Sequence, residues 1–209
     1  MRKTLFSGIA ACLLATAATA AEQSPSVIWT VGQADRSASE FALAPDRFRD
    51  FLANDFGYED KYFLVGHSVP AADFPYVLPG PADTWGGTWP TSGWRTHQVN
   101  ILFGLKEIPS DGTCTLVVDL LDYAKNFLPL VKVSVNTQDA KFQLDAPGLS
   151  VADQRKPNQM EKIVDTLSIT GNLAKATPRR LEIPIRPGVL KAGGNEVTIT
   201  VLELSLIHI

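Results

Sequence analysis

The feature that most constrains the fold is a series of short apolar runs separated by turn-forming residues. Gly, Pro, Asn and Asp bound these runs, and within several of them apolar and polar residues alternate. Such spacing is typical of an all-β sandwich, in which each sheet turns one face to the core. The expected strands cover residues 27–31, 62–66, 97–105, 114–123, 130–136, 141–144, 162–170, 180–186 and 195–204.

The run over residues 97–105 shows the alternation most clearly. One side of this predicted strand carries His97, Val99, Ile101 and Phe103. Because successive side chains of a strand point to opposite faces of a sheet, this set is expected to face the core.

Small and amide residues mark the expected turns. Gly32 and Gly66 end apolar runs where the backbone must turn sharply, and glycine tolerates the positive φ that such turns require. Asn195 follows Gly193-Gly194 and fits a tight turn into the last strand. We interpret these residues as determinants of folding and do not count them as site residues.

One short helix is expected over residues 42–57. Pro45 stands near its start, and Gly57 provides a stop signal. The apolar residues at helical spacing are Phe48, Phe51, Leu52 and Phe56. Residues 187–191 fit a second, weaker helix, but a turn with a glycine explains them as well.

The first 21 residues have the pattern of a secretory signal peptide of bacterial type. Arg2 and Lys3 precede an apolar run, and Ala18-Thr19-Ala20 forms an A-x-A cleavage site. The apolar run is too short, and its flanks are wrong, for a membrane-spanning helix. A lipoprotein signal with Cys12 as the lipidated N-terminus is the less favoured alternative. The mature protein is therefore expected to be secreted or periplasmic.

Charge and cysteine content narrow the classes of partner. The chain has 19 basic and 22 acidic residues, a formal charge of −3, and loss of Arg2 and Lys3 leaves 17 against 22, or −5. A mildly acidic chain without a basic run does not fit nucleic-acid binding. After the signal peptide is removed, Cys114 is the sole cysteine, so no internal disulfide is expected, and its apolar surroundings favour a buried thiol.

The stretch from Phe74 to Trp94, FPYVLPGPADTWGGTWPTSGW, combines large aromatic rings with prolines and glycines. Sugars present C–H patches to ring faces and hydroxyls to polar edges, so this mixture suits a carbohydrate-binding loop held by a rigid scaffold. Phe74 and Val77 are expected to anchor the loop, with at least one tryptophan exposed. The candidate sugar-binding residues are Asp73, Tyr76, Asp83, Trp85, Trp89, Trp94, Arg95 and His97.

Common catalytic and metal-binding motifs do not occur in the sequence, including H-E-x-x-H, C-x-x-C, the P-loop and G-x-S-x-G. The three histidines lack a second ligand-type residue at metal spacing. A structural calcium ion is common on such sandwiches, but no dense Asp/Asn/Gly loop indicates one. No cofactor or metal is therefore expected.

A glycosidase acid–base pair needs two carboxyl groups at a set separation, and the sequence does not specify such a pair. Carboxylates in loops commonly cap turns, and we interpret these in that way. These carboxylates are Asp35, Glu40, Asp73 and Asp83.

Several stretches together resemble the third domain of the family 4 polysaccharide lyases, the rhamnogalacturonan lyases. They are IWTVGQADRSASEF at 28–41, YFLVG at 62–66, ADFPYVLPGPADTW at 72–85, VNILFGL at 99–105 and RRLEIPIRPGVLKAGGNEVTIT at 179–200. The W-x-x-G-x-x-D-R-x-x-x-E-F opening is fairly specific, whereas the last stretch recurs in many jelly rolls. The resemblance covers nearly all of the chain after the signal peptide.

The resemblance implies a jelly-roll β-sandwich similar to carbohydrate-binding modules, formed by residues 22–205. It also implies that cleavage belongs to a separate catalytic domain of a parent lyase. Two features depart from the family pattern: a signal peptide stands where the catalytic domain normally precedes, and LELSLIHI replaces an aromatic last strand. Residues 204–209 are therefore expected to be a truncated or non-native tail that forms no proper closing strand.

The sequence thus predicts a secreted module that binds pectic polysaccharide of the rhamnogalacturonan type, as an accessory domain of a lyase. Two alternatives stay open. In one, the chain is itself a lyase, with Tyr76 or His97 as the base and Arg95 as the cation that neutralises a uronate. In the other, it is a structural domain that packs on a catalytic domain. Exposed rings favour sugar binding, buried rings favour structure, and an Arg-His-Tyr cluster in a cleft favours catalysis.

Overall fold

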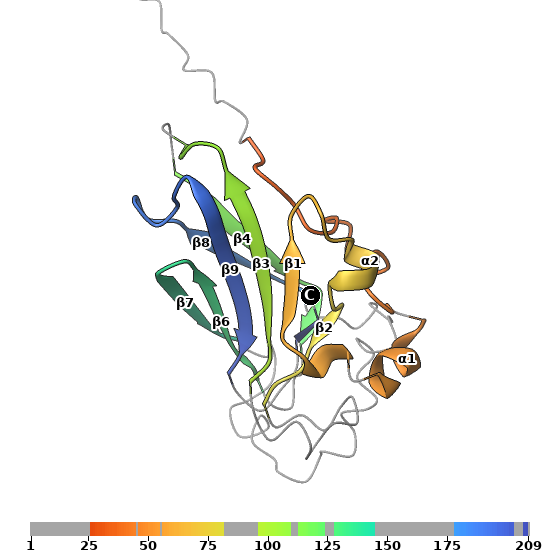
Figure 1. Ribbon diagram of the computed structural model, residues 1–209. Coiled ribbons are helices and arrows are strands. Elements are labelled where there is room, and N and C mark those ends of the chain that lie inside the picture. Colours follow the sequence, from red (N-terminus) through yellow and green to blue (C-terminus); the bar gives the residue numbers. More distant parts are fainter. Residues whose placement is uncertain are drawn as a thin grey trace, which may run out of the picture.

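A computed structural model describes residues 26–44, 46–54, 56–81, 96–109, 113–123, 128–144, 178–202 and 207–208. These residues form two layers of strands around one core, with the short helices to one side of the layers (Figure 1). The arrangement confirms the expected all-β sandwich.

The first layer is a five-stranded sheet with the order β1-β3-β9-β6-β7. Its strands are β1 (Lys61–Leu64), β3 (Gln98–Leu105), β9 (Gly193–Val201), β6 (Leu130–Val135) and β7 (Gln138–Gln143). Neighbouring strands are antiparallel, except that β1 runs parallel to β3 at the edge of the sheet.

The second layer lies behind β3 and β9 in Figure 1 and contains the antiparallel pair of β4 (Thr115–Leu120) and β8 (Arg179–Pro184). The chain path of β4 continues into β5 (Asp122–Tyr123). That strand belongs to a three-stranded sheet with β2 (Val77–Leu78) and β10 (Ile207–His208), in the order β2-β10-β5.

The core lies between the layers and is filled from both sides. The alternation in β3 is confirmed, because His97, Val99, Ile101 and Phe103 are all at most 6% exposed. The second layer contributes Val118, Leu120, Leu181 and Ile183 to the same cluster. Cys114 packs against this cluster and is half-buried. The expected burial of its thiol is therefore confirmed only in part.

The helices differ from the expected one. Residues 42–57 contain only α1 (Phe48–Ala53) and the start of the 3-10 helix η1 (Phe56–Tyr58), and a further helix α2 (Pro70–Asp73) was not predicted. The chain before α1 is held instead by a bridge to the segment after α2, in which the Ala42 amide donates to the Phe74 carbonyl at 2.9 Å. Of the described helices, none is long and apolar enough to cross a membrane.

The turns predicted at Gly32, Gly66 and residues 187–191 are confirmed. Gly32 and Gly66 have φ values of 78° and 84°, in the left-handed region that favours glycine. Residues 187–191 form a turn rather than a helix, with the Val189 amide donating to the Arg186 carbonyl.

The strand expected at 27–31 is wrong, because no strand of the described chain includes these residues. Val27 and Ile28 are 73% and 49% exposed. Trp29 and Val31 pack against the core, and the ring centroid of Trp29 is 5.2 Å from that of Phe103. The strand expected at 162–170 lies outside the described residues, and residues 141–143 of the one expected at 141–144 belong to the longer β7.

The expectation that the tail forms no closing strand is wrong for Ile207 and His208. Ile207 lies opposite Leu78 on one side and Tyr123 on the other, and His208 is likewise paired on both sides. Backbone pairing is open to any residue with an N–H and a C=O, so the lack of alternation in the tail does not prevent it. β10 therefore joins β2 to β5.

Candidate functional site

The start of the predicted sugar-binding loop is rooted in the core. Phe74 and Val77 are 2% and 1% exposed, which confirms the expected anchors. Residues 74–80 are buried throughout, and β2 within them pairs with β10. The loop therefore leaves the sandwich from a fixed base.

The far end of the loop returns to the sandwich at His97, which is 1% exposed, immediately before β3. The other predicted side chains of the loop lie outside the described residues. They are Asp83, Trp85, Trp89, Trp94 and Arg95.

Tyr76 is a core residue. It is 0% exposed, and its ring meets that of Phe51 edge-on at 4.9 Å between centroids. Burial also raises the pKa of the Tyr76 hydroxyl well above its usual range, because the phenolate would lose its hydration. We therefore assign Tyr76 and the equally buried His97 to the core instead of the sugar-binding set.

Of the loop carboxylates that the structure describes, Asp35 and Asp73 cap turns, as interpreted from the sequence, whereas Glu40 bonds to an amide seven residues away. Asp73 accepts a 2.7 Å hydrogen bond from the Val69 amide, where the chain enters α2. Asp35 accepts from the Ser37 amide at 2.9 Å, and Glu40 accepts from the Gln33 amide at 2.8 Å. One oxygen of each carboxylate is thus engaged with local backbone.

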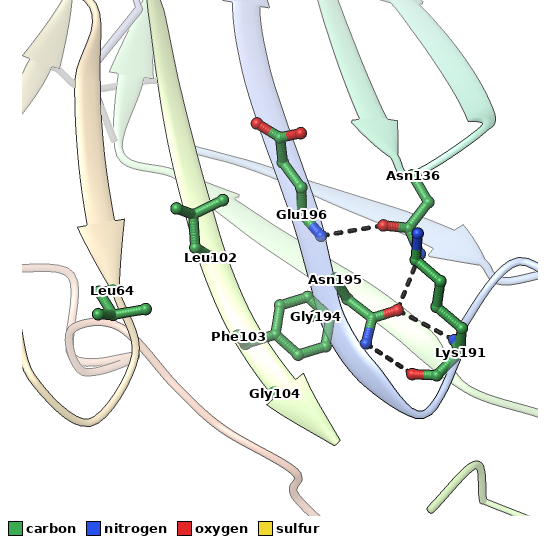
Figure 2. A pocket seen from close by; sticks show the side chains of 9 residues that line it. All are labelled: Leu64, Leu102, Phe103, Gly104, Asn136, Lys191, Gly194, Asn195 and Glu196. Atoms are coloured by element: carbon green, nitrogen blue, oxygen red, sulfur yellow. Dashed lines mark hydrogen bonds between the residues drawn. The ribbon is translucent and has the colours of Figure 1, made fainter. Parts of the chain in front are cut away.

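A shallow hollow of about 490 Å³ opens beside the outer face of the five-stranded sheet, near the ends of β1, β3 and β9 (Figure 2). Gly104 and Gly194 lie directly opposite one another in its floor, and a Cβ atom added to either would meet nothing within 4 Å. The absence of side chains at this pair leaves the hollow open. The lining residues are Leu64, Leu102, Phe103, Gly104, Asn136, Lys191, Gly194, Asn195 and Glu196.

Two buried or half-buried amides build one wall of the hollow (Figure 2). Asn195 is 4% exposed and uses both side-chain atoms: Oδ1 accepts from the Lys191 amide at 3.0 Å, and Nδ2 donates to the Lys191 carbonyl at 2.8 Å. Asn136 Nδ2 donates to Asn195 Oδ1 at 2.8 Å, and Asn136 Oδ1 accepts from the Glu196 amide at 3.0 Å. These bonds hold the backbone around Lys191 and Glu196 in place.

The hollow thereby combines an apolar side with a charged rim. Leu64, at 44% exposure, and Leu102 supply the apolar side. Lys191 and Glu196 are exposed residues of opposite charge. This mixture can receive the apolar face of a small polar ring while offering a hydrogen-bond donor and an acceptor at its edge.

A polar row crosses the whole outer face of the same sheet. The residues in register across the five strands are Tyr62, Asn100, Thr198, Ser134 and Asp139. Asn100 is 1% exposed and is fixed on two sides, because its Nδ2 donates to the Lys61 carbonyl at 3.3 Å and its Oδ1 accepts from Thr198 Oγ1 at 3.0 Å. Asn100, near the middle of the row, is therefore ordered and buried, whereas Tyr62 and Asp139 at the two ends are exposed.

The sequence interpretation missed this face, although a signal was present. In YFLVG, Phe63 is 4% exposed, whereas its neighbours Tyr62 and Leu64 are 61% and 44% exposed. Strand alternation around Phe63 alone places Tyr62 and Leu64 on the solvent side. Lys191 carries no comparable signal, because a turn positions it.

No group of three or more His, Cys, Asp or Glu side chains suited to a metal ion occurs among the residues that the structure describes. His67 and the capping carboxylates described above are thus not gathered into one site there.

Comparison with known families matches residues 27–208 to the family described as "CBM-like: Polysaccharide lyase family 4, domain III". No curated protein matches the chain. The matched span begins at the segment that carries Trp29 and includes every described strand, so it covers both layers of the sandwich and the outer face with its hollow. The chain therefore belongs to the CBM-like domain III family of the family 4 polysaccharide lyases.

Proposed function

We propose that this chain is a secreted module that binds pectic polysaccharide of the rhamnogalacturonan type, as the accessory domain of a larger lyase. The observation that carries the proposal is the match of residues 27–208 to a domain that resembles carbohydrate-binding modules. Export rests on the signal peptide pattern of residues 1–21, and mass spectrometry of the secreted protein tests it by locating the mature N-terminus.

The loop from Phe74 to Trp94 is the proposed contact with the polysaccharide. Its first residues are anchored in the core, as the burial of Phe74 and Val77 indicates, and it returns to the core at His97. A loop with both ends fixed loses less conformational entropy when it binds a ligand. The sugar-binding set that we carry forward contains Asp73, Asp83, Trp85, Trp89, Trp94 and Arg95.

A lyase activity of the chain itself has less support. That alternative uses Tyr76 or His97 as the base, and both side chains are buried. The raised pKa of the Tyr76 hydroxyl further disfavours the phenolate that would have to take the proton. The assay is absorbance of an unsaturated uronate product from rhamnogalacturonan, and steady product formation that Tyr76→Phe abolishes would establish the enzyme.

Single alanine variants of Trp85, Trp89 and Trp94 test the proposed loop. Replacement of an exposed tryptophan that stacks on sugar should reduce the retardation of the protein during electrophoresis in pectic gels. It should leave the melting temperature nearly unchanged. Trp29→Ala is the matched control, because Trp29 packs on Phe103 in the core and its loss should lower stability without a direct effect on binding.

The outcomes separate the proposed function from the structural alternative. If all three loop variants melt early and bind like the wild type, the loop is a plug or a surface for a neighbouring domain. If the wild type itself fails to bind rhamnogalacturonan and homogalacturonan, pectic binding is wrong.

A further inference from the structure

An exposed apolar strip lies on the outer face of the five-stranded sheet, apart from the tryptophan loop. Tyr62 is 61% exposed and Leu64 is 44% exposed, although both belong to a strand. In register, Leu64 lies opposite Leu102 of β3, so the strip runs along β1 and crosses to β3. It continues into the hollow, which Leu64 and Leu102 help to line (Figure 2).

The other side of this face carries lysines. Lys132 of β6 and Lys141 of β7 lie directly opposite one another, and like charges in this position are destabilising. Asp139 is 3.1 Å from Lys132 and balances only part of this charge.

The positive charge of this face is concentrated at its β6–β7 side. Lys132 and Lys141 stand there against Asp139, a local balance of +1. Asp60, which precedes β1 and accepts from the Gln98 amide, and Glu196 of β9 lie away from that side. The β6–β7 side is therefore complementary to an anionic ligand.

We propose that the outer face of the five-stranded sheet binds an anionic polysaccharide chain, in addition to the tryptophan loop. Tyr62, Leu64 and Leu102 receive the apolar faces of sugar rings, and the lysines receive carboxylates. Five strands at the usual spacing span about 19 Å, which accommodates several sugars in a row. This inference rests on the proposed polysaccharide binding and extends it to a second surface that selects uronates.

The chemistry of the face favours a polysaccharide over a protein partner. The exposed apolar residues of this face are Tyr62 and Leu64 of β1, next to the half-buried Leu102 of β3. The rest of the row is polar, with Asn100 and Thr198 already fixed by a hydrogen bond. A stable protein interface needs a larger apolar centre. A sugar chain instead requires single apolar platforms flanked by ordered polar groups.

Isothermal titration calorimetry is run with an oligogalacturonide and with a neutral galactan oligosaccharide. The comparison separates the contribution of the lysine charges from that of the apolar residues. Tyr62→Ala should weaken oligogalacturonide binding about tenfold, because an aromatic platform is lost from a surface position. Lys141→Gln should weaken it about threefold at low salt and reduce its salt dependence, with little effect on the neutral probe.

Matched controls lie on the opposite sheet. Val117→Ala removes an exposed apolar side chain of β4, and Arg180→Gln removes an exposed cation of β8. Both should bind within about twofold of the wild type, because they lie outside the proposed face. Thermal melts of all four variants confirm that each is folded.

Amide chemical shifts during the titration decide between the surfaces. Shifts in β1, β3 and β9 together with the losses above support the inference. Shifts confined to residues 74–81 and 96–97, with Tyr62→Ala and Lys141→Gln binding like the wild type, overturn it while leaving the proposed function intact. If the wild type binds neither probe, this inference is wrong, whereas the proposed function is decided by binding of rhamnogalacturonan itself. Tyr62→Ala would assign the face to a protein partner if it keeps glycan binding but loses self-association or loses binding to a separately expressed lyase domain.

Discussion

Asn136 and Asn195 are 59 residues apart in the sequence and are joined by a 2.8 Å hydrogen bond from Asn136 Nδ2 to Asn195 Oδ1. Asn136 has a φ of 48°, in the left-handed region that asparagine tolerates better than most residues. It stands in the β6–β7 turn, whereas Asn195 belongs to β9 and bonds to the turn before it. The pair thus ties two turns together at the wall of the hollow.

The first prediction is that Asn195→Ala lowers the free energy of unfolding by about 2–4 kcal/mol, because the part-buried amide and carbonyl of Lys191 lose the buried side chain that pairs with them. Urea denaturation followed by circular dichroism measures the change. Asn54→Ala is the control, because Asn54 is exposed directly after α1 and its side chain makes one hydrogen bond, to the Asp50 carbonyl. Equal stability of the two variants would show that the amide network contributes nothing.

A second prediction concerns two glycines with opposite surroundings. Gly32 has a φ of 78°, and a Cβ atom there would lie 2.5 Å from the Phe41 ring. Gly32→Ala should therefore cost about 2–4 kcal/mol, since it adds both backbone strain and a clash with the core. Gly104→Ala places its Cβ in open space at an ordinary φ and should stay within about 1 kcal/mol of the wild type. A Gly32 variant as stable as the Gly104 variant would contradict this account.

The strands that pair in the middle of the sheets could be predicted from the sequence, because burial on one face imposes a period of two. This holds for β3, where His97, Val99, Ile101 and Phe103 alternate into the core. It fails for residues 27–31, where Trp29 and Val31 pack against the core although no strand of the described chain includes them. It also fails for β2 and β10, because two-residue strands are too short to show a period.

The candidate site was predictable only in part, for a related reason. Aromatic density marked the loop from Phe74 to Trp94, but composition does not distinguish a ring on the core side from one on the solvent side. Tyr76 lies in the core, whereas Tyr62, in an ordinary-looking strand, is exposed. The hollow depends on Gly104 and Gly194 lying opposite one another, and this register is set by pairing across 90 residues of sequence.

The third prediction follows from the raised pKa of Tyr76, whose cause is burial. In the unfolded chain a tyrosine ionises near pH 10, whereas the folded chain keeps Tyr76 neutral. The unfolded state is therefore favoured as pH rises above about 10, and the stability that Tyr76 contributes is fully present below that pH. Tyr76→Phe should flatten the loss of stability between pH 9 and 11, measured by urea denaturation. An unchanged alkaline slope would show that Tyr76 ionises normally in the folded protein.

A fourth prediction concerns the C-terminal strand. Deletion of residues 204–209 removes β10 and so separates β2 from β5. The melting temperature should fall by about 4–8 °C, because several backbone groups next to the buried Val77 and Tyr123 lose their partners. Alanine replacement of Ile207 and His208 keeps the backbone pairing and should cost less than deletion. A deletion variant that melts like the wild type would show that β10 is dispensable.

The last prediction tests the charge on the outer face from the acidic side. Asp139 has a lowered pKa because Ser134 donates a hydrogen bond to it and Lys132 lies 3.1 Å away. The stabilisation that this carboxylate provides is present above the usual pKa of about 4 and is lost as pH falls through the lowered value. Asp139→Asn should therefore make the protein slightly less sensitive to acid, as urea denaturation between pH 2 and 5 measures. The same variant removes the Asp139 charge that lies next to Lys132 and Lys141, so an oligogalacturonide should bind about threefold more tightly at low salt. Asp119→Asn is the control, because it removes a carboxylate near Arg180 on the other sheet, and it should leave binding unchanged. Weaker binding by the Asp139 variant would show that Asp139 contacts the sugar directly, and equal binding by both variants would show that the lysines do not meet its carboxylates.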